Sequence, residues 1–193
     1  MIRYIVPENA TLLFVGINPH PGSYLRGVPF SNNKTFWYNL ADAGFIDKDR
    51  IYLKDDRKLK HFYLYEFSKK FGYGFINLVD RPTINTSGLK RGEEEYGVKR
   101  LNKAIKIKKP VVICFIGKIT YSRYTGNSNF KLGVQKETIY DSKVFVLSFP
   151  IRGPRSIRIG ELLELKRYLD GLSSEKAFNY AFQFANSEDG TYR

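Results

Sequence analysis

The 193-residue chain has few of the residues that common metal and redox sites need. It holds one cysteine, Cys114, and two histidines, His20 and His61. A single cysteine excludes an intramolecular disulfide, a four-cysteine zinc site and a cysteine-ligated iron–sulfur cluster. The two histidines have no carboxylate partners at a recognisable metal-ligand spacing. We therefore expect no metal, no iron–sulfur cluster and no other cofactor.

Long apolar runs are also missing. No stretch of about 18 apolar residues is present, which argues against a transmembrane helix. The N-terminal residues include Glu8 and lack the hydrophobic region of a signal peptide. We expect an intracellular monomer with no membrane partner, located in the cytoplasm and nucleoid or, in a eukaryote, in the nucleus.

Acidic residues are scarce relative to basic ones. The chain has 32 Lys and Arg against 19 Asp and Glu, a net charge of +13. Ion-pair networks on a lysine-rich surface would need more acids than these. The 16% of aromatic residues excludes a disordered basic tail, which would have little to bury. The charge favours a polyanionic partner, since basic surfaces gain affinity through counterion release, although charge alone gives no sequence specificity.

Strand-like and helix-like segments alternate along the chain. The predicted strands are residues 11–17, 74–79, 111–116 and 143–149, with an antiparallel segment within 130–140. The predicted helices are residues 32–43 (capped by Asn32 or Asn33), 61–71, 92–108 and 157–172, with a loop at 46–60. This order predicts a three-layer α/β/α fold with a central, mostly parallel sheet. We expect one domain over residues 1–172 and an extension over 173–193, with a short helix and a polar tail.

Ligands of such sheets bind at the carboxyl ends of the strands. The loops to examine are therefore 18–32, 80–91, 117–130 and 149–158. Familiar motifs are incomplete there and elsewhere. The Gly-Tyr-Gly at 72–74 lacks the third glycine of a dinucleotide fingerprint, and Gly117-Lys118 lacks the other residues of a phosphate-binding P-loop. Cys114 lies inside an apolar strand, where we interpret it as a small packed hydrophobe.

The loop that follows the first predicted strand carries a more specific pattern. Residues 16–19 read Gly-Ile-Asn-Pro, Pro29-Phe30 follows about ten residues later, and Phe36-Trp37 begins a helix. This pattern resembles the mismatch-specific uracil-DNA glycosylase / thymine-DNA glycosylase family of the uracil-DNA glycosylase superfamily. Residues 74–83, ending in Leu-Val-Asp-Arg-Pro-Thr, extend the resemblance, as do Gly117-Lys118 and the segment 144–172. It covers residues 8–172 in collinear order.

The resemblance implies a sheet of the uracil-DNA glycosylase type and a base-excision repair activity. The enzyme would flip a damaged or mispaired base, uracil or thymine opposite guanine, out of double-stranded DNA and hydrolyse its N-glycosidic bond without a cofactor. Asn18 would hold the attacking water, and Phe30 would stack on the base. The backbone N–H groups of Ile17 and Phe30 would bind the base carbonyls. Ser23 matches a pocket position near the C5 edge of the base.

Two residues near these motifs have less defined roles. His20 stands where the family most often has glycine, and its side chain either lines the base pocket or points to solvent. Lys118 matches a residue that meets a phosphate, with a solvated lysine at a helix start as the alternative.

The last loop departs from the family pattern. The family has an Asn-Pro-Ser-Gly type of segment there, whereas residues 148–156 read Ser-Phe-Pro-Ile-Arg-Gly-Pro-Arg-Ser, with one residue inserted. Phe149 occupies the position of the family asparagine. We assign Arg152 and Arg155 to the DNA backbone or the widowed base, and Gly153-Pro154 to the tip of the intercalating loop. An ordinary basic surface loop is the alternative.

Other readings of the same residues stay open. Without the resemblance, Asn18 is a turn residue that caps its own backbone, and Phe30 is a core aromatic. For the whole protein, the altered last loop allows a different base, such as hypoxanthine or an etheno adduct. A catalytically idle, glycosylase-like DNA-binding module is a further possibility, and a generic α/β protein that binds nucleotides or RNA is another.

Overall fold

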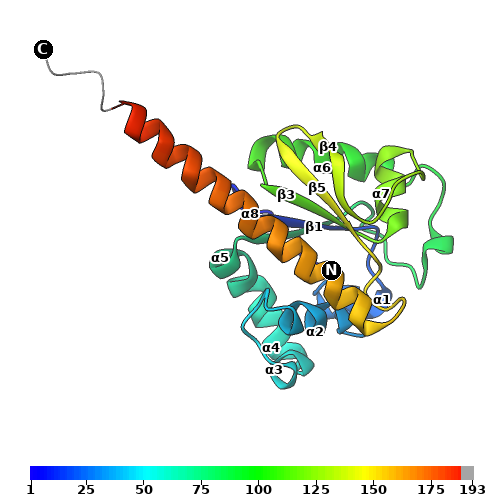
Figure 1. The fold of residues 1–193 in the computed structure, drawn as a ribbon. Coiled ribbons are helices and arrows are strands. Elements are labelled where there is room, and N and C mark those ends of the chain that lie inside the picture. Colours follow the sequence, from blue (N-terminus) through cyan, green and yellow to red (C-terminus); the bar gives the residue numbers. More distant parts are fainter. Residues whose placement is uncertain (188–193) are drawn as a thin grey trace, which may run out of the picture.

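A central five-stranded sheet lies between two layers of helices (Figure 1). This computed structural model describes the backbone of residues 1–187 and the side chains of residues 1–174. The strand order is β2-β1-β3-β5-β4, and only β4 runs antiparallel to its neighbour. The strands are β1 (Leu12–Gly16), β2 (Tyr73–Asn77), β3 (Val112–Ile116), β4 (Gly133–Ile139) and β5 (Ser142–Leu147). The predicted α/β class, the central position of β3 and the antiparallel β4 are confirmed.

The helices form one layer on each face of the sheet. They are α1 (Pro21–Arg26), α2 (Thr35–Asp42), α3 (Arg50–Lys54), α4 (Asp56–His61), the π-helix η1 (Phe62–Glu66), α5 (Phe67–Phe71), the 3-10 helix η2 (Thr86–Gly88), α6 (Glu95–Lys108), α7 (Lys118–Thr125) and α8 (Arg155–Ser187). In Figure 1, α2 to α5 and α8 cover one face, and α6 and α7 cover the other. None of the helices within residues 1–187 is long and apolar enough to cross a membrane.

The inner strands are apolar on both sides because both faces of the sheet are covered. Every residue of β1 and β3 is buried. Successive side chains of a strand point to opposite faces. Leu12 and Phe14 therefore join the core under α2 to α5 and α8, whereas Leu13 and Val15 join the core under α6 and α7. Continuous apolar runs in the sequence correspond to strands in the middle of the sheet.

One glycine sets how closely α6 approaches the sheet. A Cβ added at Gly97 would lie 1.5 Å from the backbone oxygen of Leu78. Any other residue at position 97 would push α6 away from the end of β2. The segment after β2, which belongs to the functional edge of the sheet, therefore depends on this contact.

The structure corrects the prediction of a loop at residues 46–60. This segment contains α3 and α4, which begin after Asp49 and Asp55. The Asp49 side chain accepts a hydrogen bond from the N–H of Tyr52, and Asp55 accepts from two N–H groups in the next turn. Each short helix buries only one leucine, Leu53 or Leu59. Their polar composition concealed the helical pattern, whereas the aspartate caps indicate the starts.

Two helix ends also differ from the prediction. Helix α2 begins after Lys34, which has a left-handed backbone, rather than after Asn32 or Asn33. Asn33 still contributes, because its Oδ1 accepts a hydrogen bond from the N–H of Thr35. Helix α8 continues without a break from Arg155 to Ser187 and projects beyond the sheet, so no separate helix begins after residue 172 (Figure 1). The part of the predicted polar tail at 188–193 lies outside the described residues.

Candidate active site

The loops that follow β1 and β2 are joined at the carboxyl edge of the sheet. The N–H of Leu78 donates to the oxygen of Gly16 over 2.9 Å, and the N–H of Val79 donates to that of Ile17 over 2.8 Å. Further along, the N–H of Thr83 donates to the oxygen of Pro19 over 3.1 Å. These bonds place residues 16–19 directly beside residues 78–83, so the two loops form one unit.

Asn18 is oriented by this unit. Its Nδ2 donates to Thr83 Oγ1 at 2.7 Å and lies 3.2 Å from the oxygen of Pro19 and 3.4 Å from that of Arg81. All three partners accept, so the amide nitrogen faces the protein. Among the described side chains and backbone groups, none donates a hydrogen bond to Asn18 Oδ1. This half-buried oxygen can therefore accept a hydrogen bond from a water or a ligand.

Phe30 has an unusual backbone for a bulky residue, with φ at +53°. Left-handed conformations of this kind cost about 1 kcal/mol or more and persist where neighbours hold them. Here Trp37 Nε1 donates to the oxygen of Pro29 over 2.7 Å, and the N–H of Lys34 donates to the oxygen of Phe30 itself. The half-buried Phe30 ring packs against Phe36, with a centroid distance of 4.9 Å. The turn thus holds the ring in one place.

Two backbone donors expected at the site are unpaired in the described part of the chain. Neither the N–H of Ile17 nor that of Phe30 donates a hydrogen bond to any group that the structure describes. Backbone N–H groups nearly always have a hydrogen-bond partner. Donors that have none within the protein are therefore available to a water or a ligand. Oxygen atoms of a bound base are suitable acceptors for them.

Ser23 and His20 act first as supports of the loop. Ser23 is buried, and its Oγ accepts a hydrogen bond of 2.9 Å from the N–H of Asn32. His20 is the N-cap of α1, and its Nδ1 accepts from the N–H of Gly22 at 3.1 Å. The pocket roles expected for both residues remain predictions.

Asn77 is a polar residue at this edge to which the sequence patterns assigned no role. It lies at the end of β2, is only 2% exposed, and its Nδ2 donates to the Tyr4 hydroxyl at 2.8 Å. Its Oδ1 is buried and has no partner among the described residues. A Cβ at Gly16 would lie 2.2 Å from this oxygen, so any side chain at position 16 would displace the Asn77 amide. An amide at the end of an otherwise apolar strand was the available signal.

Thr83 is a second residue whose role the sequence patterns did not indicate. Its hydroxyl accepts from Asn18 and in turn donates to the oxygen of Asn85 over 2.6 Å. The surrounding loop is held by ion pairs between Arg81 and Glu93 and between Arg100 and Asp80. The hydrogen bond from Arg81 lowers the pKa of Glu93 to about 2. The acid therefore stays ionised and the loop stays tied to the start of α6 at neutral pH.

The base of the last loop is fastened, whereas its tip is exposed. Glu161 accepts a hydrogen bond from the N–H of Ser148 at 2.8 Å. Arg152, Gly153 and Pro154 are exposed, and the oxygens of the first two accept hydrogen bonds from Arg158. Arg155 is not free, because it pairs with Asp42 at 2.8 Å.

Phe149 connects the loop after β5 with the turn that carries Phe30. Its ring centroid lies 5.9 Å from that of Phe30, with an angle of 56° between the rings. The residue that departs from the family pattern is therefore in contact with the aromatic ring expected to stack on the base.

Lys118 is exposed at the start of α7. It lines a groove of about 570 Å³ together with hydroxyl-bearing residues and Arg123. These surroundings suit an anionic group. Among the side chains that the structure describes, residues 1–174, no three of the His, Cys, Asp and Glu types are grouped so that they could hold a metal ion.

A comparison with protein families agrees with this arrangement. The family model of the uracil DNA glycosylase superfamily matches residues 3–157, which is most of the chain and includes both joined loops and the last loop. Members of this superfamily are DNA glycosylases, which act on DNA in base excision repair by hydrolysing N-glycosyl bonds. The fold and the match together show that the chain belongs to the uracil DNA glycosylase superfamily.

Proposed function

We propose that this protein is a monofunctional, mismatch-directed glycosylase that removes uracil or thymine opposite guanine from double-stranded DNA. The observation that carries the proposal is the orientation of Asn18. Its Nδ2 is committed to Thr83, and its Oδ1 is left as an acceptor at the carboxyl edge of the sheet. Such a fixed acceptor suits the positioning of one water against a bound nucleotide.

The reaction needs little chemistry from side chains. The oxygen of a water bonds to C1′ of the deoxyribose while the bond from C1′ to the base nitrogen breaks. The electron pair of that bond leaves with the base, one water proton goes to solvent, and the base takes up a proton. An amide is a poor base, so Asn18 orients the water rather than deprotonating it. Most of the acceleration must then come from stabilising the leaving base and the cation-like sugar.

Three polar groups at the edge suit recognition of a pyrimidine. The unpaired N–H groups of Ile17 and Phe30 are donors for its two carbonyl oxygens, where charge develops as the base leaves. The buried Asn77 Oδ1 is an acceptor for its ring N–H. A base that satisfies all three would also relieve an uncompensated buried acceptor, which is otherwise costly.

Single-turnover excision on labelled duplexes tests the proposal. The substrates carry G·U, G·T, A·U or hypoxanthine pairs, and alkali cleaves the abasic products. We expect strand breaks at G·U or G·T from the wild-type protein. Asn18→Ala should reduce the rate by about 100-fold or more, since a misplaced reactant costs that much. It should still bind duplex DNA in a salt-sensitive way.

Asn33→Ala is the matched control, because it removes an exposed asparagine that bonds to a backbone N–H in α2. Its excision rate should stay within about twofold of wild type, because small surface changes seldom propagate. Unchanged excision by Asn18→Ala would show that the water is held elsewhere. Tight binding without breaks at any lesion would favour an idle binding module.

Phe149 favours a second candidate substrate. An aromatic residue stands against Phe30 where the family has an asparagine, so the site offers two rings to a bound base. Larger fused rings, as in hypoxanthine or an etheno adduct, gain more from such stacking. Breaks at hypoxanthine alone in the same assay would move the specificity to these bases while keeping the mechanism.

A further inference from the structure

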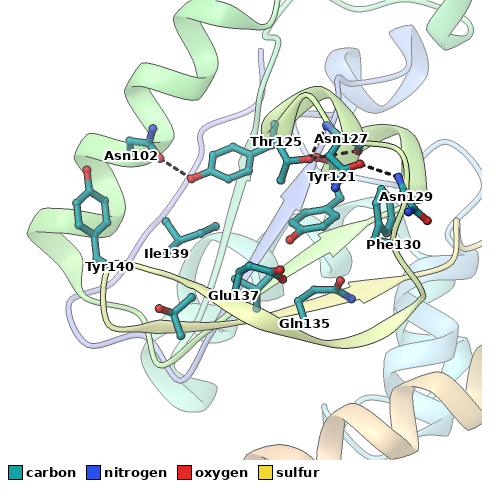
Figure 2. Close-up of a pocket in the computed structure, with 13 residues that line it drawn as sticks. Asn102, Tyr121, Thr125, Asn127, Asn129, Phe130, Gln135, Glu137, Ile139 and Tyr140 are labelled. Atoms are coloured by element: carbon teal, nitrogen blue, oxygen red, sulfur yellow. Dashed lines mark hydrogen bonds between the residues drawn. The ribbon is translucent and has the colours of Figure 1, made fainter.

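A second cavity lies away from Asn18, between α7 and the edge strand β4. It has a volume of about 520 Å³, within the range of small-ligand sites. Figure 2 shows Tyr140 on one side and Phe130 on the other, with Gln135 and Glu137 of β4 between them. Tyr121 and Tyr124 of α7 complete an aromatic lining. We call this space the tyrosine cavity.

The strand that forms its floor is irregular at this place. Val134 pairs with Phe145 and Thr138 pairs with Lys143, so residues 135–137 of β4 lie opposite Val144 alone. Two extra residues on one strand make a bulge, and bulges re-aim side chains beside functional sites. Gln135, Glu137 and Val144 all line the cavity. The bulge therefore presents one amide and one carboxylate to it.

Tyr140 occupies a position that is unfavourable for its residue type. It lies in the tight turn between β4 and β5 with φ at +53°, a conformation that glycine and asparagine adopt at less cost. Its side chain is nonetheless 54% exposed, so burial of the ring does not explain the choice. An exposed aromatic ring held in a strained turn beside a cavity suits contact with a ligand.

The other aromatic residues of the cavity are fixed. The rings of Tyr121 and Phe130 meet edge to face with centroids 4.8 Å apart. The Tyr124 hydroxyl donates to Asn102 Oδ1 at 2.7 Å. In Figure 2 this hydrogen bond is the dashed line that begins at Asn102. Glu137 is the one charged residue among those that line the cavity. Flat rings with amides and hydroxyls around them suit an uncharged planar ligand that carries polar edges.

A basic groove adjoins the tyrosine cavity. Phe130 lines both, and the groove also contains Lys118, Arg123, Ser87 and Ser122. Arg123 is paired with Glu94, whereas no acidic partner of Lys118 occurs among the described residues. Hydroxyl groups and a free ammonium group suit a phosphate. An aromatic cavity next to such a groove matches the needs of a nucleotide, with stacking for the base and cations for the backbone.

We propose that the tyrosine cavity binds one unpaired base of single-stranded DNA, while the groove of Lys118 takes the adjoining phosphate. Tyr140 stacks on the ring, Gln135 and Glu137 face its polar edge, and Phe130 bounds the cavity on the side of the Lys118 groove. The choice of DNA over other nucleic acids rests on the proposed function, whereas the cavity itself does not involve Asn18.

Binding of fluorescein-labelled 12-nucleotide strands, measured by anisotropy, tests this inference. One probe is oligothymidylate, and the other is a strand of the same length with abasic sugar–phosphate units only. The wild-type protein should bind the strand with bases at least about fivefold more tightly, the lower end of what one stacked base contributes. Tyr140→Ala should abolish this preference and leave the affinity for the abasic strand unchanged.

Tyr65→Ala is the matched control. Tyr65 is 56% exposed, close to the value for Tyr140, and lies in η1 on the opposite face of the sheet. It should keep the full preference for bases. Equal affinity of the wild-type protein for both strands would overturn the inference, as would equal affinities of the two tyrosine variants. A third probe, an RNA oligouridylate of the same length, distinguishes DNA from RNA. Tighter binding of this strand than of oligothymidylate would overturn the assignment to DNA.

This outcome is separable from that of the proposed function. Tyr140→Ala should excise the target base from duplex DNA at the wild-type rate, and Asn18→Ala should keep the preference for strands with bases. A wild-type protein that prefers strands with bases but excises no target base would contradict only the catalytic proposal. A wild-type protein that excises the target base but binds both strands equally would contradict only the tyrosine cavity.

Discussion

The loop after β1 and the loop after β5 lie at the same edge of the sheet but are built differently. Residues 16–19 are joined to the β2 loop by backbone hydrogen bonds, and the side chain of Asn18 is held by Thr83. Residues 152–154 are exposed, and Arg158 donates hydrogen bonds to the backbone oxygens of Arg152 and Gly153. Groups that position a reactant need a rigid frame. Groups that meet a large, variable surface such as DNA work from an exposed tip.

Thr83 offers the strongest test of the rigid side of this comparison. Thr83→Val keeps the shape of the side chain but removes the acceptor that fixes Asn18 Nδ2. We expect excision of the target base to fall by about 10- to 100-fold, because the amide oxygen is no longer held in one orientation. Single-turnover excision at saturating protein measures the effect.

Thr83→Ser is the matched control, since it restores the hydroxyl and should restore most of the rate. DNA affinity should change little in either variant. Equal rates for the valine and serine variants would mean that Thr83 only packs. They would contradict the claim that its hydroxyl holds Asn18 in a rigid frame.

Arg152 tests the exposed side. Arg152→Ala should weaken duplex binding several-fold and reduce the slope of log Kd against log salt by about one, the value for one lost phosphate contact. The rate at saturating protein should stay near that of wild type. Affinity measured at several salt concentrations checks both points.

Arg57→Ala in α4 removes the same charge elsewhere on the exposed surface. A drop of equal size and equal salt dependence in this control would show that Arg152 acts only through the net charge. A large fall in the rate of Arg152→Ala would instead place the arginine in catalysis.

Asp42 gives the smallest expected effect and concerns the ion pair that ties Arg155 to the end of α2. Its carboxylate pairs with Arg50 and with Arg155 of the last loop, and these hydrogen bonds lower its pKa. A lowered folded-state pKa stabilises the protein above the pKa of the unfolded chain, and this contribution is lost as the pH falls through the folded value. We expect Asp42→Asn to cost no more than about 1 kcal/mol at pH 7, as for other surface pairs.

Urea unfolding at about pH 7 and pH 3 measures this difference, which should shrink at the lower pH. Asp42→Asn should also free Arg155 and so raise duplex affinity slightly. A difference in stability that is the same at both pH values would show that the ion pairs contribute nothing, and that the cost arises from packing.

Much of the fold was predictable because its inner strands are buried on both faces. The apolar runs that became β1 and β3 followed from burial on both faces, and α6 lies within the helix predicted at residues 92–108. The helices α3 and α4 were missed, since each buries only one leucine and so has almost no apolar face. Aspartate caps, rather than hydrophobic periodicity, mark such segments.

The sequence by itself determined which chemical groups stand at the carboxyl edge of the sheet, because strand–loop order places the Gly-Ile-Asn-Pro and Asp-Arg-Pro-Thr segments there. Only the tertiary structure decided how these groups are used. The bond from Asn18 to Thr83 spans 65 positions, and the contact between Phe30 and Phe149 spans two distant loops. The unpaired oxygen of Asn77, the pairing of Arg155 with Asp42 and the tyrosine cavity were likewise hidden. The physical reason is that side-chain orientation and hydrogen-bond partners depend on segments brought together by packing, which local sequence patterns do not encode.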